Sequence, residues 1–275
     1  MKCMELLRDA SHRNQSLLCI GLDPDPRQIP AMLHASADPI YAFCMAIVEA
    51  TADLVCAFKP NIAFFEALGP AGVATLQRLV ADMPRTVPVV IDAKRGDIGS
   101  TAAAYAQALF ARLGADAVTL SPYLGGDALK PFLDYAEKGC FILCKTSNSG
   151  SGDLQDLKLA SGEPLYLAVA RQAQHTWNTN GNVGLVVGAT YPAVLAQVRA
   201  ACPDLALLVP GVGAQGGGLA AAVRAAVDTD NAGALINASR SILYASGGAD
   251  FAEAARQEAL RLRDAINTAR GLPTR

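Results

Sequence analysis

The sequence predicts a single (β/α)8 barrel that spans residues 1–275, and three observations support this fold class. The chain has 275 residues, and barrels of this class run to about 250 residues. Eight short apolar runs alternate with eight longer, often alanine-rich stretches of helical periodicity. The apolar runs are almost continuously hydrophobic, which is typical of parallel strands covered on both faces. An open doubly wound sheet is the alternative, because hydropathy does not encode the closure of a sheet.

Each expected strand is a run rich in Val, Ile and Leu, and the strands cover residues 17–22, 54–59, 87–92, 115–120, 140–145, 183–188, 206–209 and 233–237. The expected helices cover residues 40–52, 70–82, 99–113, 126–137, 162–179, 191–200, 217–228 and 249–269. Phe43, Ile47 and Ala50 recur at the spacing of one buried helical stripe. No linker divides the chain, so we expect one domain. The long polar stretch 147–162 (SNSGSGDLQDLKLASG) is typical of a lid or binding loop.

Composition excludes several classes of protein. The chain is 52% hydrophobic and 17% charged, with 23 Lys and Arg against 25 Asp and Glu, a net charge of −2. This balance does not favour a disordered chain, nucleic-acid binding or an anionic membrane surface. No apolar run approaches the roughly 18–20 residues that span a bilayer. The polar start MKCMELLRDASHRNQ is unlike a secretory signal, so a cytoplasmic location is expected.

Cysteine and histidine usage does not predict a metal site. The seven cysteines are an odd number, and Cys19, Cys56, Cys140 and Cys144 lie in apolar segments, as small core residues of a reducing cytoplasm do. The three histidines are scattered and no CxxC pair occurs. We therefore expect no zinc site and no metal cofactor.

In a barrel of this class the active site lies where the strands end and the following loops begin. Polar side chains at these ends are Asp23, Asp25, Lys59, Asn61, Asp92, Lys94, Asp97, Ser100, Thr101, Ser121, Tyr123, Lys145, Thr146, Ser147, Asn148, Gln215, Asn237, Ser239 and Arg240.

Asp92 and Lys94 are the most informative pair among them. They stand two residues apart at a strand end, so both side chains should point into the barrel. Lys59, from the neighbouring strand, can join them. Such charges are costly to bury unless they are paired. The pattern favours a catalytic cluster, and a structural salt bridge that closes the barrel top is the alternative.

A glycine-rich turn follows the seventh strand. Gly211-x-Gly213-x-x-Gly216 matches a dinucleotide-binding pattern, but it lies late in the chain and no acidic strand end follows at the expected distance. Loops after strands seven and eight of such barrels commonly bind phosphate through backbone N–H groups. Arg240, just past strand eight, can add a charge-assisted contact. The sequence therefore favours a phosphate site over a dinucleotide site.

The segment IDAKRGDIGST resembles the signature Asp-x-Lys-x-x-Asp-Ile/Val-x-x-Thr of the orotidine 5′-phosphate decarboxylase family, here Asp92, Lys94, Asp97, Ile98 and Thr101. The blocks GLDPD, FKPN, KTSN, PGVGAQ and SRS follow the family's order, so the resemblance covers about residues 15–245. The KTSNSG and PGVGAQGGG blocks are similar to the longer bacterial subgroup. The Asp-x-Lys-x-x-Asp core alone is shared with sugar-phosphate decarboxylases of the same superfamily.

The resemblance implies a role for each matched residue. The charged catalytic network would consist of Lys59, Asp92, Lys94 and Asp97. The protein would be a homodimer that shares Asp97 and Thr101 across its interface. The implied substrate-binding residues are Asp23 and Lys59 at ribose, Ser147 at the pyrimidine, Gln215 between pyrimidine and phosphate, Arg240 at phosphate, and Gly216 and Ser239 in the same loops. Gly217 and Gly218 stand where some members carry a phosphate-binding Tyr, which shifts that contact toward backbone amides.

The resemblance also implies a reaction, the cofactor-independent decarboxylation of orotidine 5′-monophosphate (OMP) to uridine 5′-monophosphate (UMP) in pyrimidine synthesis. Lys94 would donate the proton to C6. Three other readings remain: a magnesium-dependent sugar-phosphate decarboxylase or epimerase, a Schiff-base aldolase using Lys94 or Lys145, and an inactive nucleotide-binding barrel. The carboxylates beside Lys94 disfavour the neutral amine that an aldolase needs.

Overall fold

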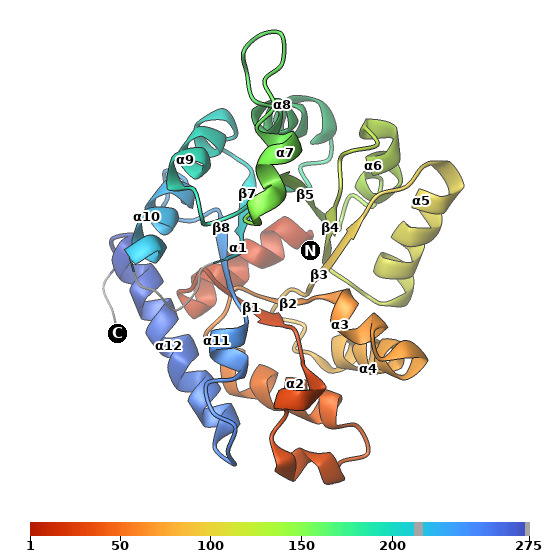
Figure 1. Cartoon of the computed structure of the whole chain (residues 1–275), viewed down its shortest axis with the longest axis vertical. Helices are drawn as coiled ribbons and strands as arrows, with labels where there is room; N and C mark the ends of the chain where they lie inside the picture. Colours follow the sequence, from red (N-terminus) through yellow and green to blue (C-terminus); the bar gives the residue numbers. More distant parts are fainter. Residues whose placement is uncertain (212–216, 273–275) are drawn as a thin grey trace.

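Eight parallel strands form a ring at the centre of the molecule, and helices surround it (Figure 1). The computed structural model describes residues 1–211 and 217–272. The strands are β1 Leu18–Leu22, β2 Ala57–Pro60, β3 Val90–Arg95, β4 Ala117–Leu120, β5 Gly139–Lys145, β6 Val183–Val187, β7 Ala206–Val209 and β8 Ala234–Ala238. They pair in the order β2-β1-β8-β7-β6-β5-β4-β3. Isolated parallel bridges, Phe58 to Val89 and Asn61 to Asp92, join β2 to β3. The barrel prediction is confirmed, and the open sheet is excluded.

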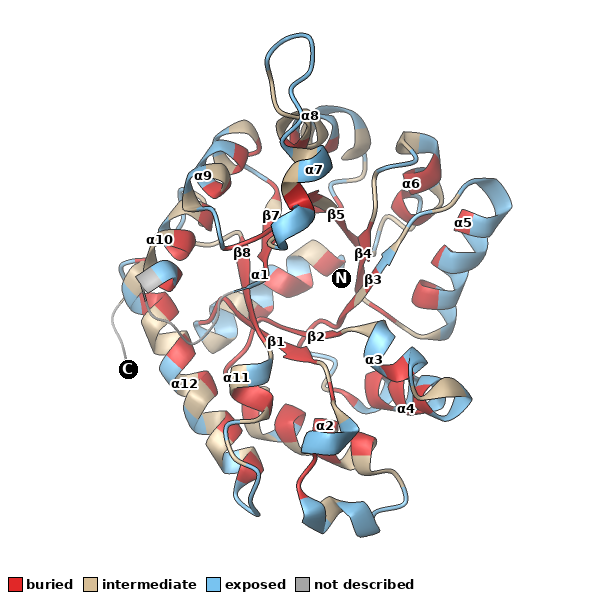
Figure 2. Ribbon diagram, viewed as in Figure 1, coloured by how far each residue is buried: buried red, intermediate tan, exposed pale blue. Residues whose placement is uncertain are grey.

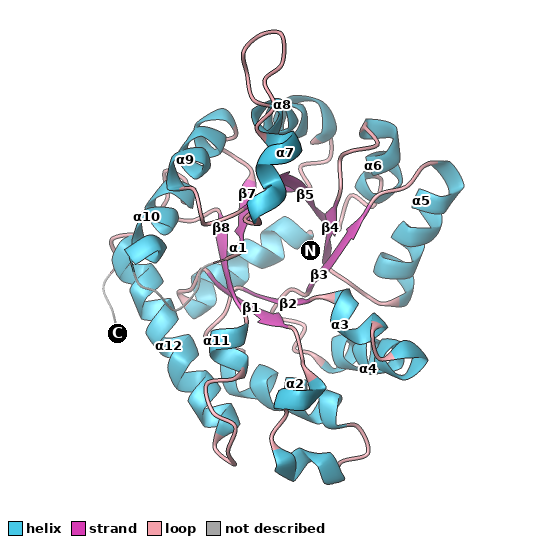
Figure 3. Cartoon of the chain, in the orientation of Figure 1, coloured by secondary structure: helices cyan, strands magenta, loops and turns pink. Residues whose placement is uncertain are grey.

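The helices are α1 Cys3–Asn14, α2 Pro39–Thr51, α3 Ile62–Glu66, α4 Gly69–Asp82, α5 Gly99–Ala106, α6 Gly126–Leu133, α7 Gly152–Gln155, α8 Leu165–Gln172, α9 Pro192–Ala201, α10 Gly217–Ala226, α11 Arg240–Leu243 and α12 Phe251–Ala269 (Figure 3). The turns Gln107–Arg112 and Ala173–Trp177 extend α5 and α8 as π-helix. Within the described residues, no helix is long and apolar enough to cross a membrane.

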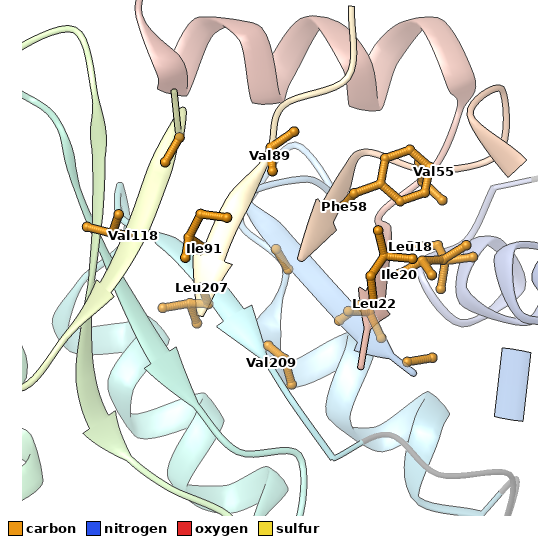
Figure 4. Packing of buried hydrophobic residues seen from close by; sticks show 14 of the residues in the cluster. Leu18, Ile20, Leu22, Val55, Phe58, Val89, Ile91, Val118, Leu207 and Val209 are labelled. Atoms are coloured by element: carbon orange, nitrogen blue, oxygen red, sulfur yellow. The ribbon is translucent and has the colours of Figure 1, made fainter. Parts of the chain in front are cut away.

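Alternate residues of each strand face two different apolar layers. Leu18, Ile20 and Leu22 of β1 pack outward against the helices, as do Ile91 and Val209 of other strands (Figure 4). Burial is therefore concentrated on the strands and on the inner stripes of the helices (Figure 2). This two-sided burial explains why the strands read as continuous apolar runs rather than as alternating ones. All seven cysteines are free and buried, as the apolar contexts of several of them predict.

A second layer fills the barrel interior with one side chain from each strand: Cys19, Ala57, Val90, Ala117, Phe141, Val186, Leu208 and Leu235. Because side chains alternate along a strand, the next inward positions lie two residues further along. On β2, β3, β4 and β8 those positions hold Lys59, Asp92, Thr119 and Asn237. The barrel is thus apolar in its middle and polar at its carboxyl-terminal mouth.

The helix α1 was not predicted from the sequence. Its buried residues Cys3, Leu6, Leu7 and Ala10 form one stripe, and Cys3 and Leu7 pack against the barrel interior. The helix therefore covers the amino-terminal end of the barrel, opposite the polar mouth. The short helices α3, α7 and α11 were also missed, and α7 lies inside the stretch expected to be a loop.

The end of the third strand was misplaced as well. The sequence predicts a strand over residues 87–92, whereas β3 runs from Val90 to Arg95. A prediction from hydropathy ends the strand at its first charged residue, but at a barrel mouth charged residues can continue the strand. Lys94 therefore lies inside β3 rather than beyond it, and Asp92, expected as the last residue of the strand, lies in its middle.

Candidate active site

A lysine–aspartate–lysine cluster lies where β2 and β3 approach the mouth of the barrel. The Nζ of Lys59 is 3.1 Å from Oδ2 of Asp92. The Nζ of Lys94 is 2.6 Å from Oδ1 of the same carboxylate. The Lys59 side chain is 4% exposed, whereas that of Lys94 is 48% exposed. One carboxylate therefore joins a buried ammonium group to one that a ligand in the mouth can reach.

Burial and opposite charge act against each other in this cluster. Burial alone would raise the pKa of Asp92, but Lys59 and Lys94 outweigh it and hold that pKa below its usual value. Burial would lower the pKa of Lys59, yet the carboxylates of Asp92 and Asp23 outweigh it and raise that pKa. Asp92 and Lys59 are therefore both charged at neutral pH, and each charge depends on its neighbours.

The backbone of β3 is irregular at this cluster. Ile91 pairs with Val118 and Arg95 pairs with Leu120, so β3 contains extra residues between these points. Lys94 lies there with φ +47°, in the left-handed region. Its N–H donates to Oγ1 of Thr119 at 2.9 Å. Bulges near active sites re-aim side chains, and this one directs Lys94 toward Asp92.

Two buried acceptors lie on the β1 and β8 side of the mouth. Oδ1 of Asp23 and Oδ1 of Asn237 accept no hydrogen bond from any described residue. The two strand ends lie side by side, because Cys19 of β1 pairs with Asn237 of β8. Buried acceptors without donors are rare. This side of the mouth therefore offers oxygen atoms to a donor from water or from a ligand.

Ser147 follows β5 and packs closely against two glycines, Gly188 and Gly211. A Cβ built on Gly188 would lie 2.8 Å from the backbone nitrogen of Ser147, and one on Gly211 would lie 3.4 Å from its Oγ. These glycines follow β6 and β7. The loop is also tied down, because the N–H of Thr146 donates to Oε1 of Gln155 on α7 at 2.9 Å. The close packing places Ser147, half-buried, at the mouth between three strand ends.

The predicted phosphate contacts are described only in part. Arg240 is the exposed first residue of α11, and Ser239 immediately precedes it. Ser239 packs on Gly21 of β1 so closely that a Cβ there would be 1.9 Å from its Oγ. Gln215 and Gly216 lie outside the described residues, which resume at residue 217.

Asp97 and Thr101 do not join the cluster of their own chain. Oδ1 of Asp97 accepts the N–H of Ile98 at 2.8 Å, and the described residues give it no ion pair with Lys94. Thr101 is exposed on α5. The signature residues therefore separate into an inner group at the mouth and an outer group on the molecular surface.

Two polar residues near the mouth were not assigned a site role from the sequence. Thr119 is a lone hydroxyl inside an apolar strand, a context in which β-branched residues are common, so nothing singled it out. Lys145 was considered only as an aldolase lysine. Its Nζ is 2.8 Å from Oδ1 of Asp156 and 5.6 Å from the ring of Tyr191. This ion pair between a buried lysine and a half-exposed aspartate joins the ends of β5 and α7.

A cavity of about 520 Å³ lies elsewhere, between α1 and the amino-terminal ends of β6 to β8. Leu7, Arg8, His12 and Asp228 are among its lining residues, and none of the predicted site residues is. Active sites of barrels of this class lie at the opposite end. The charged cluster, rather than this cavity, therefore marks the candidate active site.

Comparison with known proteins agrees with this location. The model of the "Orotidine 5′-phosphate decarboxylase / HUMPS family" matches residues 16–257. The chain is 63% identical over 269 residues to an orotidine 5′-phosphate decarboxylase of Roseiflexus castenholzii, with 98% of each chain covered. It is 57% identical to one of Paracidovorax citrulli, covering 98% of this chain and 100% of that one.

A solved structure shows the same architecture. The structure of Leishmania donovani OMP decarboxylase is 44% identical and superposes with a TM-score of 0.86, covering 99% of this chain and 100% of that one. The matched region contains every described residue of the cluster and of the mouth. With this match over most of its length and the Asp92–Lys94 pair at the mouth of its barrel, the chain belongs to the orotidine 5′-phosphate decarboxylase / HUMPS family.

Proposed function

We propose that the protein decarboxylates OMP to UMP and carbon dioxide, in de novo pyrimidine biosynthesis. The observation that carries this proposal is the Lys59–Asp92–Lys94 cluster at the barrel mouth, in a chain 63% identical to a curated decarboxylase of that name. The chemistry of the cluster suits the reaction, because loss of carbon dioxide leaves a negative charge that an ammonium group can stabilise.

In the proposed step the bond between C6 and the carboxylate breaks, carbon dioxide leaves, and the electron pair stays on C6. Lys94 stabilises this charge and then donates its ammonium proton to C6. The neutral amine regains a proton from solvent, which its 48% exposed side chain can reach. Asp92 lies beside the substrate carboxylate and disfavours the bound ground state. No metal or organic cofactor takes part in this route.

Substrate binding is assigned to the surrounding strand ends. Asp23 and Lys59 meet the ribose hydroxyls, which would supply donors to the unpaired Oδ1 of Asp23. Ser147 hydrogen-bonds the pyrimidine. Phosphate is bound by Gln215, Gly216, Ser239 and Arg240. Phosphate lies far from C6, yet its binding energy can lower the barrier if it closes the loops after β5 and β7 over the mouth.

We propose further that the working unit is a homodimer in which Asp97 and Thr101 complete the partner subunit's site. Apolar side chains are exposed after β3 and after its neighbour β4, as a surface that a second copy covers would have. Ile98, next to Asp97 in the sequence, is 59% exposed, and Tyr123, which follows β4, is 78% exposed. A two-fold axis would present the same patch from both subunits. Sedimentation as a monomer at assay concentrations would contradict this proposal.

A reducing, cytoplasmic location is also proposed, and the free, buried state of all seven cysteines supports it. Fractionation of the native cells is the measurement, and recovery outside the cytoplasmic fraction would contradict it.

The activity is tested by following the ultraviolet absorbance of OMP with purified protein, with and without EDTA. We expect loss of the substrate signal at a rate that EDTA does not change. Inhibition by EDTA, with turnover restored by Mg²⁺, would favour a magnesium-dependent member of the superfamily. Binding of UMP without any turnover of OMP would indicate an inactive nucleotide-binding barrel.

A further inference from the structure

We infer that Thr119 is a positioning residue that holds Asp92 and Lys94 in their reactive arrangement. The inference rests on the proposed decarboxylation and names a residue outside the charged cluster. Thr119 lies in the middle of β4 and is 1% exposed. Its hydroxyl is engaged by Asp92 and by the backbone of Lys94, so its effect on the reaction acts through these neighbours.

Both hydrogen-bonding functions of the Thr119 hydroxyl are used on the cluster. Its Oγ1 donates to Oδ1 of Asp92 at 2.9 Å, and it accepts the backbone N–H of Lys94 at 2.9 Å. The ammonium of Lys94 donates to the same Oδ1 at 2.6 Å. One hydroxyl therefore fixes the backbone of the proposed proton donor and the carboxylate that the donor contacts.

The irregularity of β3 explains why a side chain, rather than a backbone carbonyl, accepts the N–H of Lys94. Between Ile91 and Arg95 the strand advances four residues while β4 advances two, from Val118 to Leu120. Regular ladder bonds are lost across such a bulge. The Thr119 side chain takes their place for the N–H of Lys94, whose φ of +47° is unfavourable for a residue with a Cβ. Without the hydroxyl, that N–H loses its acceptor and the left-handed conformation loses a support.

The expected consequence is a change in the chemical step rather than in affinity. Asp23, Ser147 and Arg240, proposed to bind ribose, pyrimidine and phosphate, lie on other strand ends. Lys59 contacts the other oxygen of Asp92, Oδ2, and not the one that Thr119 holds. Misplacement of Lys94 and Asp92 affects the developing charge at C6, which is present only in the transition state.

The test compares Thr119→Val, which keeps the shape and removes the hydroxyl, with Thr119→Ser, which keeps the hydroxyl. Thr119→Ala serves if the valine variant does not fold. Thr75→Val is the matched control, because Oγ1 of Thr75 donates to Oδ2 of Asp38 at 2.7 Å, away from the mouth. We expect Thr119→Val to lower kcat about 10- to 100-fold, with UMP affinity within about twofold of wild type. Thr119→Ser should recover most of kcat, and Thr75→Val should keep it.

Equal kcat values for Thr119→Val and Thr75→Val would overturn the inference, and so would parallel losses of kcat and UMP affinity. If wild-type protein does not turn over OMP at all, the proposed function fails instead. A crystal structure of Thr119→Val then tests the positioning itself. Lys94 should leave the left-handed region, and an unchanged backbone there would contradict the inference.

Discussion

Ser147 lies so close to Gly188 that position 188 has no room for a residue larger than glycine. A Cβ built on Gly188 would be 2.8 Å from both the backbone nitrogen and the Cβ of Ser147. The N–H of Gly188 donates to the carbonyl of Lys145 at 2.8 Å, which fixes the two strand ends relative to each other. Because the contacts are with backbone, they yield only if the loop moves. The missing side chain at Gly188 therefore determines where Ser147 stands at the mouth.

Gly188→Ala should displace Ser147 and weaken binding of the pyrimidine. We expect KM for OMP to rise about tenfold, because small displacements of a positioning contact are costly. Gly247→Ala is the matched control, since nothing lies within 4 Å of a Cβ at Gly247. Steady-state kinetics of both variants measure the effect. A KM equal to that of the control would remove Ser147 from the binding site.

The buried Lys59–Asp92 pair makes stability depend on pH in a defined way. The pKa of Asp92 is lowered from 3.8, so its stabilising contribution is present above that pH and is lost in stronger acid. The pKa of Lys59 is raised from 10.5, so its contribution is present below that pH and is lost as the pH rises through the folded-state pKa. Between these limits the contribution of the pair should be constant.

Asp92→Asn leaves Lys59 buried with Asp23 as its remaining acidic neighbour. Burial then lowers the pKa of Lys59, and we expect a loss of about 3 kcal/mol in the free energy of unfolding at pH 7. The loss should shrink as the pH rises toward 10, because neutral Lys59 no longer carries the burial cost. Urea unfolding between pH 6 and 10 measures this, with the surface variant Asp134→Asn as control. A loss that stays constant over this range would contradict the assignment.

Arg240→Ala tests the proposed phosphate contact. The exposed guanidinium has no ion pair with a described residue, and a charge-assisted bond to phosphate is worth about 10- to 100-fold in kcat/KM. Most of the loss in kcat/KM should appear as a higher KM, and kcat should fall by a smaller factor. The control is Arg261→Ala on α12, where Arg261 pairs with Glu258. If Arg240→Ala keeps kcat/KM within about twofold, the contact is not made.

Sharing of Asp97 across a dimer is tested by mixing two inactive variants. An Asp97→Ala subunit paired with a Lys94→Ala subunit contains one intact site and one doubly defective site. Half of the dimers in an equal mixture are of this kind, so about one quarter of wild-type activity should return after subunit exchange. No recovery, with exchange verified by mass spectrometry, would show that each site uses its own Asp97.

The strands were predictable because burial on both faces leaves an unmistakable apolar run, as in residues 183–188. The helix α1 was missed because Arg8, Asp9 and other charges mask its stripe, although Cys3, Leu6, Leu7 and Ala10 have helical spacing. The end of β3 was not predictable, because hydropathy does not encode a bulge or the left-handed backbone of Lys94.

The same reasoning explains what could be predicted of the site. Strand ends converge in a barrel, so the contact between Lys59 and Asp92 followed from their positions on adjacent strands. The role of Thr119 could not be predicted, because it depends on the irregularity in β3 opposite Thr119, and no sequence pattern indicates that irregularity. The roles of Asp23, Ser147, Ser239 and Arg240 in substrate binding stay predictions, as do those of Gln215 and Gly216.

Turnover of OMP by Lys94→Ala is the most direct test of the central proposal, that Lys94 stabilises and protonates C6. Lys130→Ala is the matched control, because Lys130 is exposed on α6 and pairs with Asp134. We expect the control to match wild type. Lys94→Ala should bind UMP yet lose at least about a thousandfold in kcat, since stabilising charge and proton are both removed. A Lys94→Ala rate within about tenfold of wild type would contradict the proposal.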